Sequence, residues 1–177
     1  HGIYGGLTKR LFLLQACSEK VPPRILIFSK TAGYRHGCIP VATAALRKMC
    51  LENGIAVDTT EEAEDFTENN LKRYNAVVFL CTTGDVLTPT QEADFERYIQ
   101  AGGGFVGIHS ATDTEYGWTW FGGLVGAYFN GHPKQQNATL HVQDHDFLAT
   151  KHLKGNDWAR FDEWYNFKDL NPKTHVL

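Results

Sequence analysis

Four short apolar segments, alternating with segments of helical periodicity, constrain the fold of this chain more than any other feature. The apolar segments are Arg24–Ser29 (RILIFS), Ile55–Thr59, Ala76–Cys81 (AVVFLC) and Phe105–His109. They have the length of strands, and an unbroken apolar run is typical of a strand that is buried on both faces. The resulting β-α-β-α-β-α-β order predicts an α/β fold, with a doubly wound, flavodoxin-like parallel sheet and helices on both of its faces.

The three intervening segments have apolar residues at helical spacing. They are Val41–Asn53, Phe66–Tyr74 and Pro89–Ala101. Pro40 and Pro89 suit the first turn of a helix, where a missing backbone N–H costs nothing. Thr67 and Thr88 suit helix N-caps, because their hydroxyls accept a hydrogen bond from a free backbone N–H. A further short helix is expected near Trp120–Val125.

The stretch GGGFVGIHSATD, residues 102–113, contains the leading candidate for a functional residue. It ends with His109 directly after the fourth apolar segment, followed by small residues and Asp113. Ligands of open α/β sheets bind outside the carboxyl ends of the strands, which is where His109 is expected. An imidazole there can serve as a base, an acid or a metal ligand, and a capping or packing histidine is the competing interpretation.

Three known motifs do not fit this stretch. Gly102, Gly104 and Gly107 spell G-x-G-x-x-G, but they precede and enter a strand, whereas the dinucleotide fingerprint follows one. A nucleophile elbow would need serine where His109 stands, and an amidotransferase elbow would need cysteine. The sequence also lacks a phosphate-binding P-loop. We therefore expect no nucleotide cofactor and no glutaminase activity.

Loops that follow the carboxyl ends of neighbouring parallel strands meet at one edge of the sheet. From them we select His109 and His36 as catalytic candidates, with Glu163 from the DEWYNF segment closing one side. The candidates for substrate binding are polar residues of the same loops and segment: Arg35, Thr83, Gly84, Asp85, Ser110, Asp113, Tyr116 and Tyr165.

A metal site at this edge remains open. Histidines with one carboxylate are zinc or non-haem metal ligands, but no tight spacing such as H-E-x-x-H is present. Catalytic or hydrogen-bonding imidazoles are favoured, so no cofactor is assigned and a zinc-like metal is kept as the alternative. Cys81 could be a nucleophile beside His109, although a small buried side chain is favoured. The other histidines are expected on loops or the surface: His132, His141, His145 and His152.

Composition excludes several classes of partner. The 177 residues carry a formal net charge of −3, and the sequence contains no basic stripe. Both observations argue against nucleic acid as the main partner. No apolar run reaches the length of a membrane span. Aromatic residues make up 12% of the chain. All four tryptophans lie in its second half, which suits a wall for a flat, partly apolar ligand such as a sugar.

The two ends of the chain differ from the α/β core. Residues 1–23 are expected to be a lead-in, or the remnant of a signal or linker. Lys9-Arg10 followed by LFLLQAC is similar to the end of a lipoprotein signal with Cys17 as acceptor, which favours a secreted or lipid-anchored protein over a cytoplasmic one. Strands are expected at Ala138–Gln143 and Asp162–Phe167. A strand beginning at His175 would end abruptly, so domain 24–177 is interpreted as truncated.

Several blocks of sequence together resemble the trehalose-utilisation (ThuA-like) family. They are FSKTAGYRH, VVFLCTTGDVL, FERYIQAGGGFVGIHSATDTEY, FGGLVGAYFNGHP and DEWYNF, in the family's order from Arg24 onward. The resemblance implies a fold like the class I glutamine amidotransferases, with the elbow cysteine replaced here by His109. It also implies a link to disaccharide or keto-sugar metabolism and, often, a place in a larger secreted chain.

The leading hypothesis is a sugar-directed lyase, hydrolase or isomerase that acts on an oxidised glycoside. A keto group acidifies the neighbouring C–H, and His109 could remove that proton while Arg35 or His36 stabilises the enolate. The alternative is a non-catalytic carbohydrate-binding or scaffolding domain of a larger secreted protein. His36, His109 and Glu163 around one void would favour the enzyme, and dispersed side chains would favour the binding domain.

Overall fold

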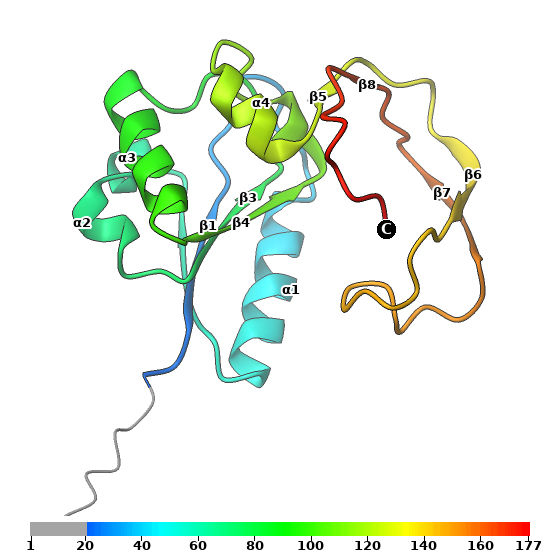
Figure 1. The fold of residues 1–177 in the computed structure, drawn as a ribbon, viewed down its shortest axis with the longest axis horizontal. Helices are drawn as coiled ribbons and strands as arrows, with labels where there is room; N and C mark the ends of the chain where they lie inside the picture. Colours follow the sequence, from blue (N-terminus) through cyan, green and yellow to red (C-terminus); the bar gives the residue numbers. More distant parts are fainter. Residues whose placement is uncertain (1–20) are drawn as a thin grey trace, which may run out of the picture.

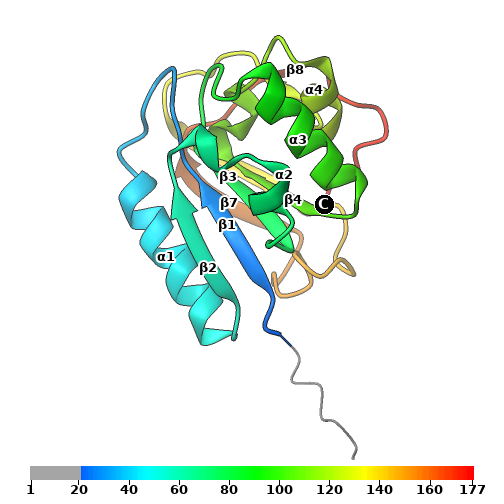
Figure 2. The same cartoon turned by 90° about the vertical axis from the view of Figure 1, so that its left-hand side faces the viewer.

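Each of the four apolar segments forms one strand of a single parallel sheet. The computed structural model describes residues 21–177, and its sheet has the order β2-β1-β3-β4 (Figure 2). The strands are β1 (Arg24–Phe28), β2 (Ala56–Thr60), β3 (Ala76–Leu80) and β4 (Gly104–Ile108). All three pairings are parallel, so the predicted parallel α/β sheet is confirmed. This strand order is that of flavodoxin-like folds, in which ligands bind beyond the carboxyl ends of the strands.

Helices cover both faces of the sheet. On one face lies α1 (Ile39–Glu52), where Ile39 and Leu46 pack against Ile27 and Val78. Pro40 stands in the first turn of α1, as predicted. The other face is covered by α2 (Glu68–Leu71), α3 (Pro89–Gln100) and α4 (Thr119–Val125). Figure 2 shows α1 and α3 on opposite sides of the strands.

An aromatic cluster fills the space between the sheet and α3. Its centre is Phe79 on β3, which has no exposed surface. Five other phenylalanine rings have centroids between 5.2 and 5.8 Å from that of Phe79: Phe28, Phe66, Phe95, Phe105 and Phe121. Edge-on and tilted ring pairs at such distances add to the stabilisation that burial alone provides. The sheet is therefore anchored on a densely packed face.

The helix predicted over residues 66–74 is shorter than expected. It spans only Glu68–Leu71, and the hydroxyl of Thr67 accepts the N–H of Asn70 at its start, as predicted for a cap. The N–H of Arg73 is bonded to Asn70 and that of Tyr74 to Leu71, so the last turn tightens to i→i+3 bonds. Tyr74 then donates to Asp58 on β2, which requires the chain to leave the helix early.

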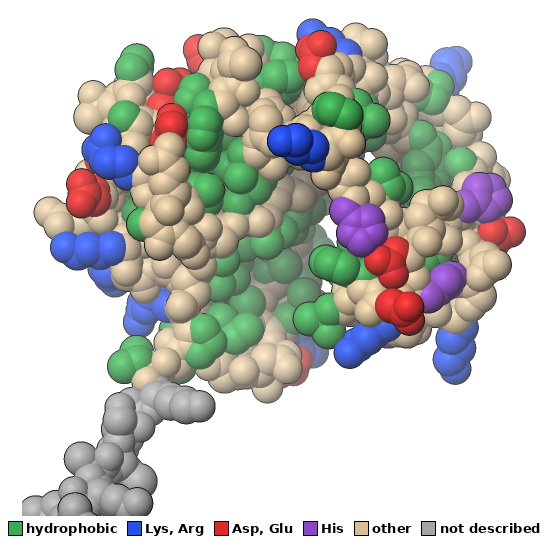
Figure 3. All heavy atoms as spheres, in the orientation of Figure 1, with side chains coloured by type: hydrophobic (Ala, Val, Ile, Leu, Met, Phe, Trp, Pro, Cys, Tyr) green, Lys and Arg blue, Asp and Glu red, His purple; other side chains and the backbone are tan. Residues whose placement is uncertain are grey.

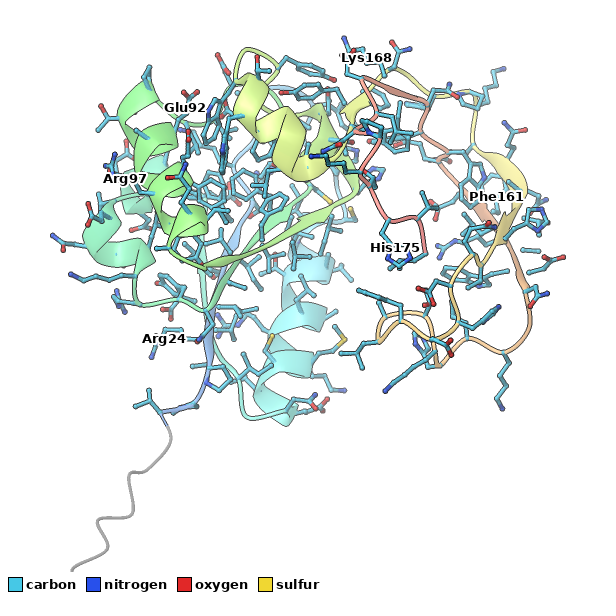
Figure 4. All side chains as sticks on the ribbon, in the orientation of Figure 1. Arg24, Glu92, Arg97, Phe161, Lys168 and His175 are labelled. Atoms are coloured by element: carbon cyan, nitrogen blue, oxygen red, sulfur yellow. The ribbon has the colours of Figure 1, made fainter. Side chains whose placement is uncertain are left out.

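The last third of the chain is built differently. We call residues 128–177 the C-terminal arm. In it β5 (Tyr128–Phe129) pairs with β8 (Phe167–Lys168), and β6 (Gln136–His141) pairs with β7 (Asp157–Asp162), both antiparallel. In Figure 1, β6 and β7 stand apart from the main sheet. Figure 4 places Phe161 on β7 at the opposite side of the molecule from Arg97 on α3.

Two strand predictions in the arm are wrong. Residues 162–167 do not form one strand, because β7 ends at Asp162, β8 begins at Phe167 and 163–166 lie in an irregular connection. The chain changes partners there, from β6 to β5, and one continuous strand could not pair with both. No strand forms at His175–Leu177, which pair with no strand among residues 21–177. His175 instead lies 3.1 Å from a carboxylate oxygen of Asp144.

The expected signal-like segment, including Cys17, lies outside residues 21–177 except for its last three residues. Within residues 21–177, no helix combines the length and the apolar character needed to cross a membrane.

Candidate functional site

Two histidines meet at the carboxyl edge of the sheet. His36 lies in the loop between β1 and α1, and His109 directly follows β4. Their Nε2 atoms are 3.0 Å apart, and the two rings meet edge to face with centroids 4.5 Å apart. The structure thus brings together two residues that are far apart in the sequence, because parallel strands deliver their following loops to the same edge.

His109 has an unusual backbone conformation. Its φ angle is 54°, in the left-handed region, at the point where β4 passes into the 3-10 helix His109–Asp113. A residue with a Cβ pays roughly 1–2 kcal/mol for this conformation. Strained residues of this kind cluster at functional sites. The sharp turn points the imidazole away from the strand, the geometry by which a nucleophile elbow displays its side chain.

The C-terminal arm contributes the other half of the cluster. Glu163 and Tyr165 come from the connection between β7 and β8. The Oε2 atom of Glu163 lies 3.3 Å from His109 Nε2 and 4.0 Å from His36 Nε2. The Tyr165 hydroxyl lies 3.0 Å from the same His109 nitrogen, and its ring packs on the imidazole with centroids 4.5 Å apart. Three of the sequence-selected residues therefore surround His109.

Burial shifts the pKa values of two of these groups. It lowers the pKa of His36, and the neighbouring His109 lowers it further. Burial also raises the pKa of Tyr165, with the nearby Glu163 carboxylate adding to the rise. At neutral pH, His36 is therefore a neutral imidazole with a free lone pair, and Tyr165 is a phenol that can donate its proton. This combination suits proton transfer or metal binding.

The cluster lines a cleft of about 600 Å³. That volume lies within the range of small-molecule sites. Besides the cluster residues His36, His109, Glu163 and Tyr165, the lining residues are Tyr34, Cys38, Asp113, Phe129, His132, Gln135 and Asp162. The lining combines aromatic rings with polar side chains, which is the mixed character that a sugar needs from its binding site.

Histidines outside this cleft form a different kind of pair. On the face shown in Figure 3, the visible histidines lie over the C-terminal arm beside acidic side chains. His141, for example, has its Nδ1 atom 2.7 Å from Asp157, and both side chains are more than 60% exposed. By contrast, the side chains of His36, His109 and Glu163 are 15%, 28% and 20% exposed. The cleft cluster is thus partly shielded from water.

Arg35, which was selected for substrate binding, points elsewhere. Its guanidinium forms two hydrogen bonds with Glu61, at 2.7 and 2.9 Å, and it does not line the cleft. Asp85 is also outside the cleft lining, and it raises the pKa of the buried carboxyl group of Glu115. The structure does not bring either residue to the histidines.

Three other selected residues lie beneath the cleft. Thr83 has no exposed surface, and its hydroxyl donates to the carbonyl of Tyr34. Gly84, with a φ angle of 74°, packs so closely on Ala32 and Gly33 that a Cβ would lie 3.1 Å from both. Ser110 is fully buried, with its hydroxyl 3.4 Å from His36 Nδ1. These residues hold the site loops in place.

Asp113 and Tyr116 form a pair at the cleft margin. The Tyr116 hydroxyl lies 2.7 Å from Asp113 and 3.0 Å from the carbonyl oxygen of Phe129. Asp113 lines the cleft and Tyr116 does not. Tyr116 therefore links the core to the start of the C-terminal arm.

Cys81 behaves as a small buried side chain. It is 2% exposed, and its Sγ lies 3.9 Å from that of Cys38. Burial, together with the adjacent Cys38, raises the pKa of Cys81 to about 12. The group is therefore a thiol at neutral pH, which makes it a poor nucleophile.

Sequence reasoning missed His132. It was expected to be a loop or surface residue, and its side chain is 38% exposed, yet its Nε2 lies 3.4 Å from Oε1 of Glu163. Its position follows from the pairing of β5 with β8, which brings Gly131 against Asn166 beside the site. No local periodicity could have indicated it. The only signal was its place in the block FGGLVGAYFNGHP.

Three atoms of the cluster are arranged as metal ligands could be. Single ligand atoms of His36, His109 and Glu163 all lie within 4.8 Å of one another. Imidazole nitrogen and carboxylate oxygen are ligands of zinc and of non-haem iron. The same groups can also move protons without a metal.

The fold of this chain is similar to that of known proteins. Solved structures of two ThuA-like proteins share the fold. The protein from Bacteroides uniformis has a TM-score of 0.72 and 24% identity, and the match covers 88% of this chain and 66% of that one. The protein from Parabacteroides merdae has a TM-score of 0.66 and 19% identity, covering 82% and 63%.

The chain thus spans slightly less than two thirds of the length of both structures. No curated protein matches it. The family model described as "Trehalose utilisation" matches residues 24–177, which is most of the chain and includes the whole cleft. The chain therefore belongs to the ThuA (trehalose utilisation) family.

Proposed function

We propose that this chain is an enzyme domain that acts on a keto-disaccharide or another oxidised glycoside at the His36–His109–Glu163 cluster. The observation that carries the proposal is the convergence of these three side chains, from two parts of the fold, on one cleft of about 600 Å³. The description of the family as trehalose utilisation supports a disaccharide as the substrate class.

The chemistry follows from the keto group. A carbonyl acidifies the C–H bond beside it, so a base can remove that proton while the bonding electron pair forms an enolate. The enolate oxygen then needs a hydrogen-bond donor or a cation beside it. His109 serves in this reaction as the base or as a ligand, and the Tyr165 phenol supplies a donor within 3.0 Å of it. Elimination, hydrolysis and isomerisation of a keto-glycoside can all begin with this proton removal.

The shared cleft favours an enzyme over a non-catalytic binding domain. A surface that only binds sugar needs aromatic rings and hydrogen-bonding groups, but it gains nothing from two facing imidazoles and a half-buried carboxylate. Holding His109 in a left-handed conformation also costs free energy that sugar binding alone does not require. We therefore place the non-catalytic alternative second.

Proton exchange tests the proposal directly. A keto-disaccharide is incubated with the purified chain in D₂O, and proton NMR follows loss of the signal from the carbon beside the keto group. We expect the chain to accelerate the exchange, and His109→Ala to slow it by roughly 10²–10⁴-fold, the usual cost of losing a positioned acid–base group. The matched control is His141→Ala, because His141 also pairs with a carboxylate but lies outside the cleft.

Two further measurements make the test decisive. The unoxidised parent disaccharide should show no exchange, since it has no acidified C–H. The melting temperature of His109→Ala should match that of the wild type, because His109 lies beyond the strand end in the cleft and contributes little to the core. Binding of the keto-sugar without exchange would support the non-catalytic domain, and full exchange by His109→Ala would exclude His109 as the base or ligand in the reaction.

A further inference from the structure

The His109 Nε2 atom has more close polar neighbours than it can satisfy. Within 3.3 Å of it lie His36 Nε2, the Tyr165 hydroxyl and Glu163 Oε2. An imidazole nitrogen carries either one proton or one lone pair, so it forms one good hydrogen bond and not three. Convergence of this kind is expected where lone pairs are directed at a shared point rather than at one another.

The separations fit a cation at that point. Zinc binds imidazole nitrogen at about 2.0–2.1 Å and carboxylate oxygen at about 2.0–2.2 Å, so neighbouring ligand atoms of a tetrahedron lie roughly 3.3–3.5 Å apart. The three separations among His36 Nε2, His109 Nε2 and Glu163 Oε2 are 3.0, 3.3 and 4.0 Å. They bracket that value, so small side-chain movements would complete the geometry.

Two of the three ligand side chains, His36 and Glu163, also have a partner behind them. His36 Nδ1 lies 3.4 Å from the hydroxyl of Ser110, a side chain with no exposed surface. The second carboxylate oxygen of Glu163 lies 3.4 Å from His132 Nε2. Metal-binding histidines and carboxylates are oriented by such outer partners. The partner of His36, Ser110, is fully buried, whereas both side chains of the surface pair His141–Asp157 are open to water.

We propose that His36, His109 and Glu163 bind one divalent transition-metal ion of the zinc class, with an open fourth position facing the cleft. Two imidazoles and one carboxylate are the ligands of catalytic zinc sites, and three protein ligands leave room for substrate. Magnesium and calcium prefer all-oxygen sites and do not suit this set. The fourth position is bordered by Tyr165, whose hydroxyl lies 3.0 Å from His109 Nε2.

The inference deepens the proposed function, because it concerns the same cluster. A cation there would hold the oxygen of a keto group and stabilise the enolate charge. His109 then acts as a ligand. His132, beside the other carboxylate oxygen, is the imidazole left in the cleft to accept a proton.

Metal binding can be measured without any substrate. Metal-free chain, with any purification tag removed, is titrated with Zn²⁺ by calorimetry and with Co²⁺ by visible absorption, which reports a four-coordinate site. We expect one ion per chain and no comparable binding of Mg²⁺. His109→Ala and Glu163→Gln should each weaken Zn²⁺ binding by more than the roughly 10–100-fold that loss of an outer partner costs. The control His141→Ala should bind Zn²⁺ as the wild type does.

Thermal unfolding separates lost binding from lost folding. Without metal, all four proteins should melt at similar temperatures, and Zn²⁺ should raise the melting temperature of the wild type and His141→Ala only. Glu163→Gln preserves side-chain shape, so it keeps the test valid if His109→Ala folds poorly. Equal Zn²⁺ affinity in the wild type and Glu163→Gln, equal weakening in His141→Ala, or binding of Mg²⁺ as tight as Zn²⁺ would each overturn the inference.

The two proposals can fail separately. Suppose that each chain binds one Zn²⁺ tightly but catalyses no deuterium exchange in keto-sugars. The proposed substrate class would then be refuted, and the metal site would stand. Suppose instead that chain treated with a chelator binds no Zn²⁺ but still catalyses deuterium exchange at the full rate. The proposed enzyme activity would then stand, and the proposed metal site would be refuted.

Discussion

The two regions that meet at the cleft are held in place by very different amounts of buried surface. In the sheet core, residues 24–125, Phe28, Phe79 and Phe95 have no exposed surface. In the C-terminal arm, Phe161 is 60% exposed and Trp158 is 45% exposed. The core strands lie in a four-stranded sheet covered by helices, whereas the arm has two separate two-stranded sheets. Such small sheets are marginally stable without further packing.

The residues of the site are shared between these two regions. His36 and His109 stand on the rigid core, and Glu163 and Tyr165 stand on the arm. Segments with few buried apolar contacts open at a lower free energy than core strands do. We therefore expect Glu163 and Tyr165 to be held less firmly than His36 and His109.

The largest expected effect comes from matched phenylalanines. Phe79→Ala should lower the free energy of unfolding by about 3–5 kcal/mol, since it leaves a cavity at the centre of the aromatic cluster. Phe161→Ala, on the exposed face of β7, should change it by less than about 0.5 kcal/mol. Urea unfolding measures both values. In a thermal melt, the first change corresponds to a drop of roughly 6–20 °C. Similar losses for the two variants would show that the arm has a buried core of its own.

A buried carboxyl group should make the stability of the core depend on pH. Glu115 has no exposed surface, and its Oε1 accepts the N–H groups of Val86 and Leu87, at 2.8 Å each. Burial raises its pKa to about 7, the N–H groups of Val86 and Leu87 oppose the rise, and the nearby Asp85 adds to it. Because the folded pKa exceeds the unfolded value of about 4.3, the protonated form is favoured in the folded state.

The contribution of Glu115 to stability should be complete below about pH 4.3 and lost as the pH rises through about 7, on the order of 3 kcal/mol in all. Glu115→Gln cannot ionise, so its stability relative to wild type should increase by that amount between pH 4.5 and 8. Urea unfolding at several pH values measures the difference. Parallel profiles for the two proteins would mean that Glu115 stays ionised in the core.

Two glycines with similar φ angles allow the effect of steric crowding to be measured apart from the effect of backbone strain. Gly84 and Gly155 have φ angles of 74° and 84°, so the left-handed backbone destabilises alanine at either position by roughly 1–2 kcal/mol. In the core, a Cβ on Gly84 would crowd the loop that leads to His36, whereas one on Gly155 in the arm meets nothing within 4 Å. Gly84→Ala should therefore destabilise by about 1–3 kcal/mol more than Gly155→Ala. Equal losses in urea unfolding would show that the loop yields easily.

The smallest expected effect is that of Arg35→Ala. The Arg35–Glu61 pair is about half exposed on both sides. Exposed pairs of this kind contribute about 0–1 kcal/mol. Since the guanidinium lies outside the cleft lining, the affinity for the keto-sugar should change by less than about twofold. Calorimetry of the variant and the wild type measures this difference. A large loss of affinity would show that Arg35 leaves Glu61 and reaches the ligand.

The sequence by itself was enough to predict the core. Strands such as β3 are buried on both faces, so an unbroken apolar run such as AVVFLC marks them without any knowledge of their neighbours. Pro40 and Thr67 marked helix starts, because capping depends on adjacent residues only. The position of His109 at a strand end followed from the same local pattern.

The arm and its half of the cluster were decided by tertiary structure. Glu163 and Tyr165 were selected from sequence, but as part of a strand that does not exist, and His132 was assigned to a loop or surface with no role. Their positions depend on the pairing of β5 with β8 and of β6 with β7, between segments distant in the chain. Hydrophobic periodicity reports how a segment faces its own surroundings. It does not report which distant segment becomes its partner, and that choice places the carboxylate beside the two histidines.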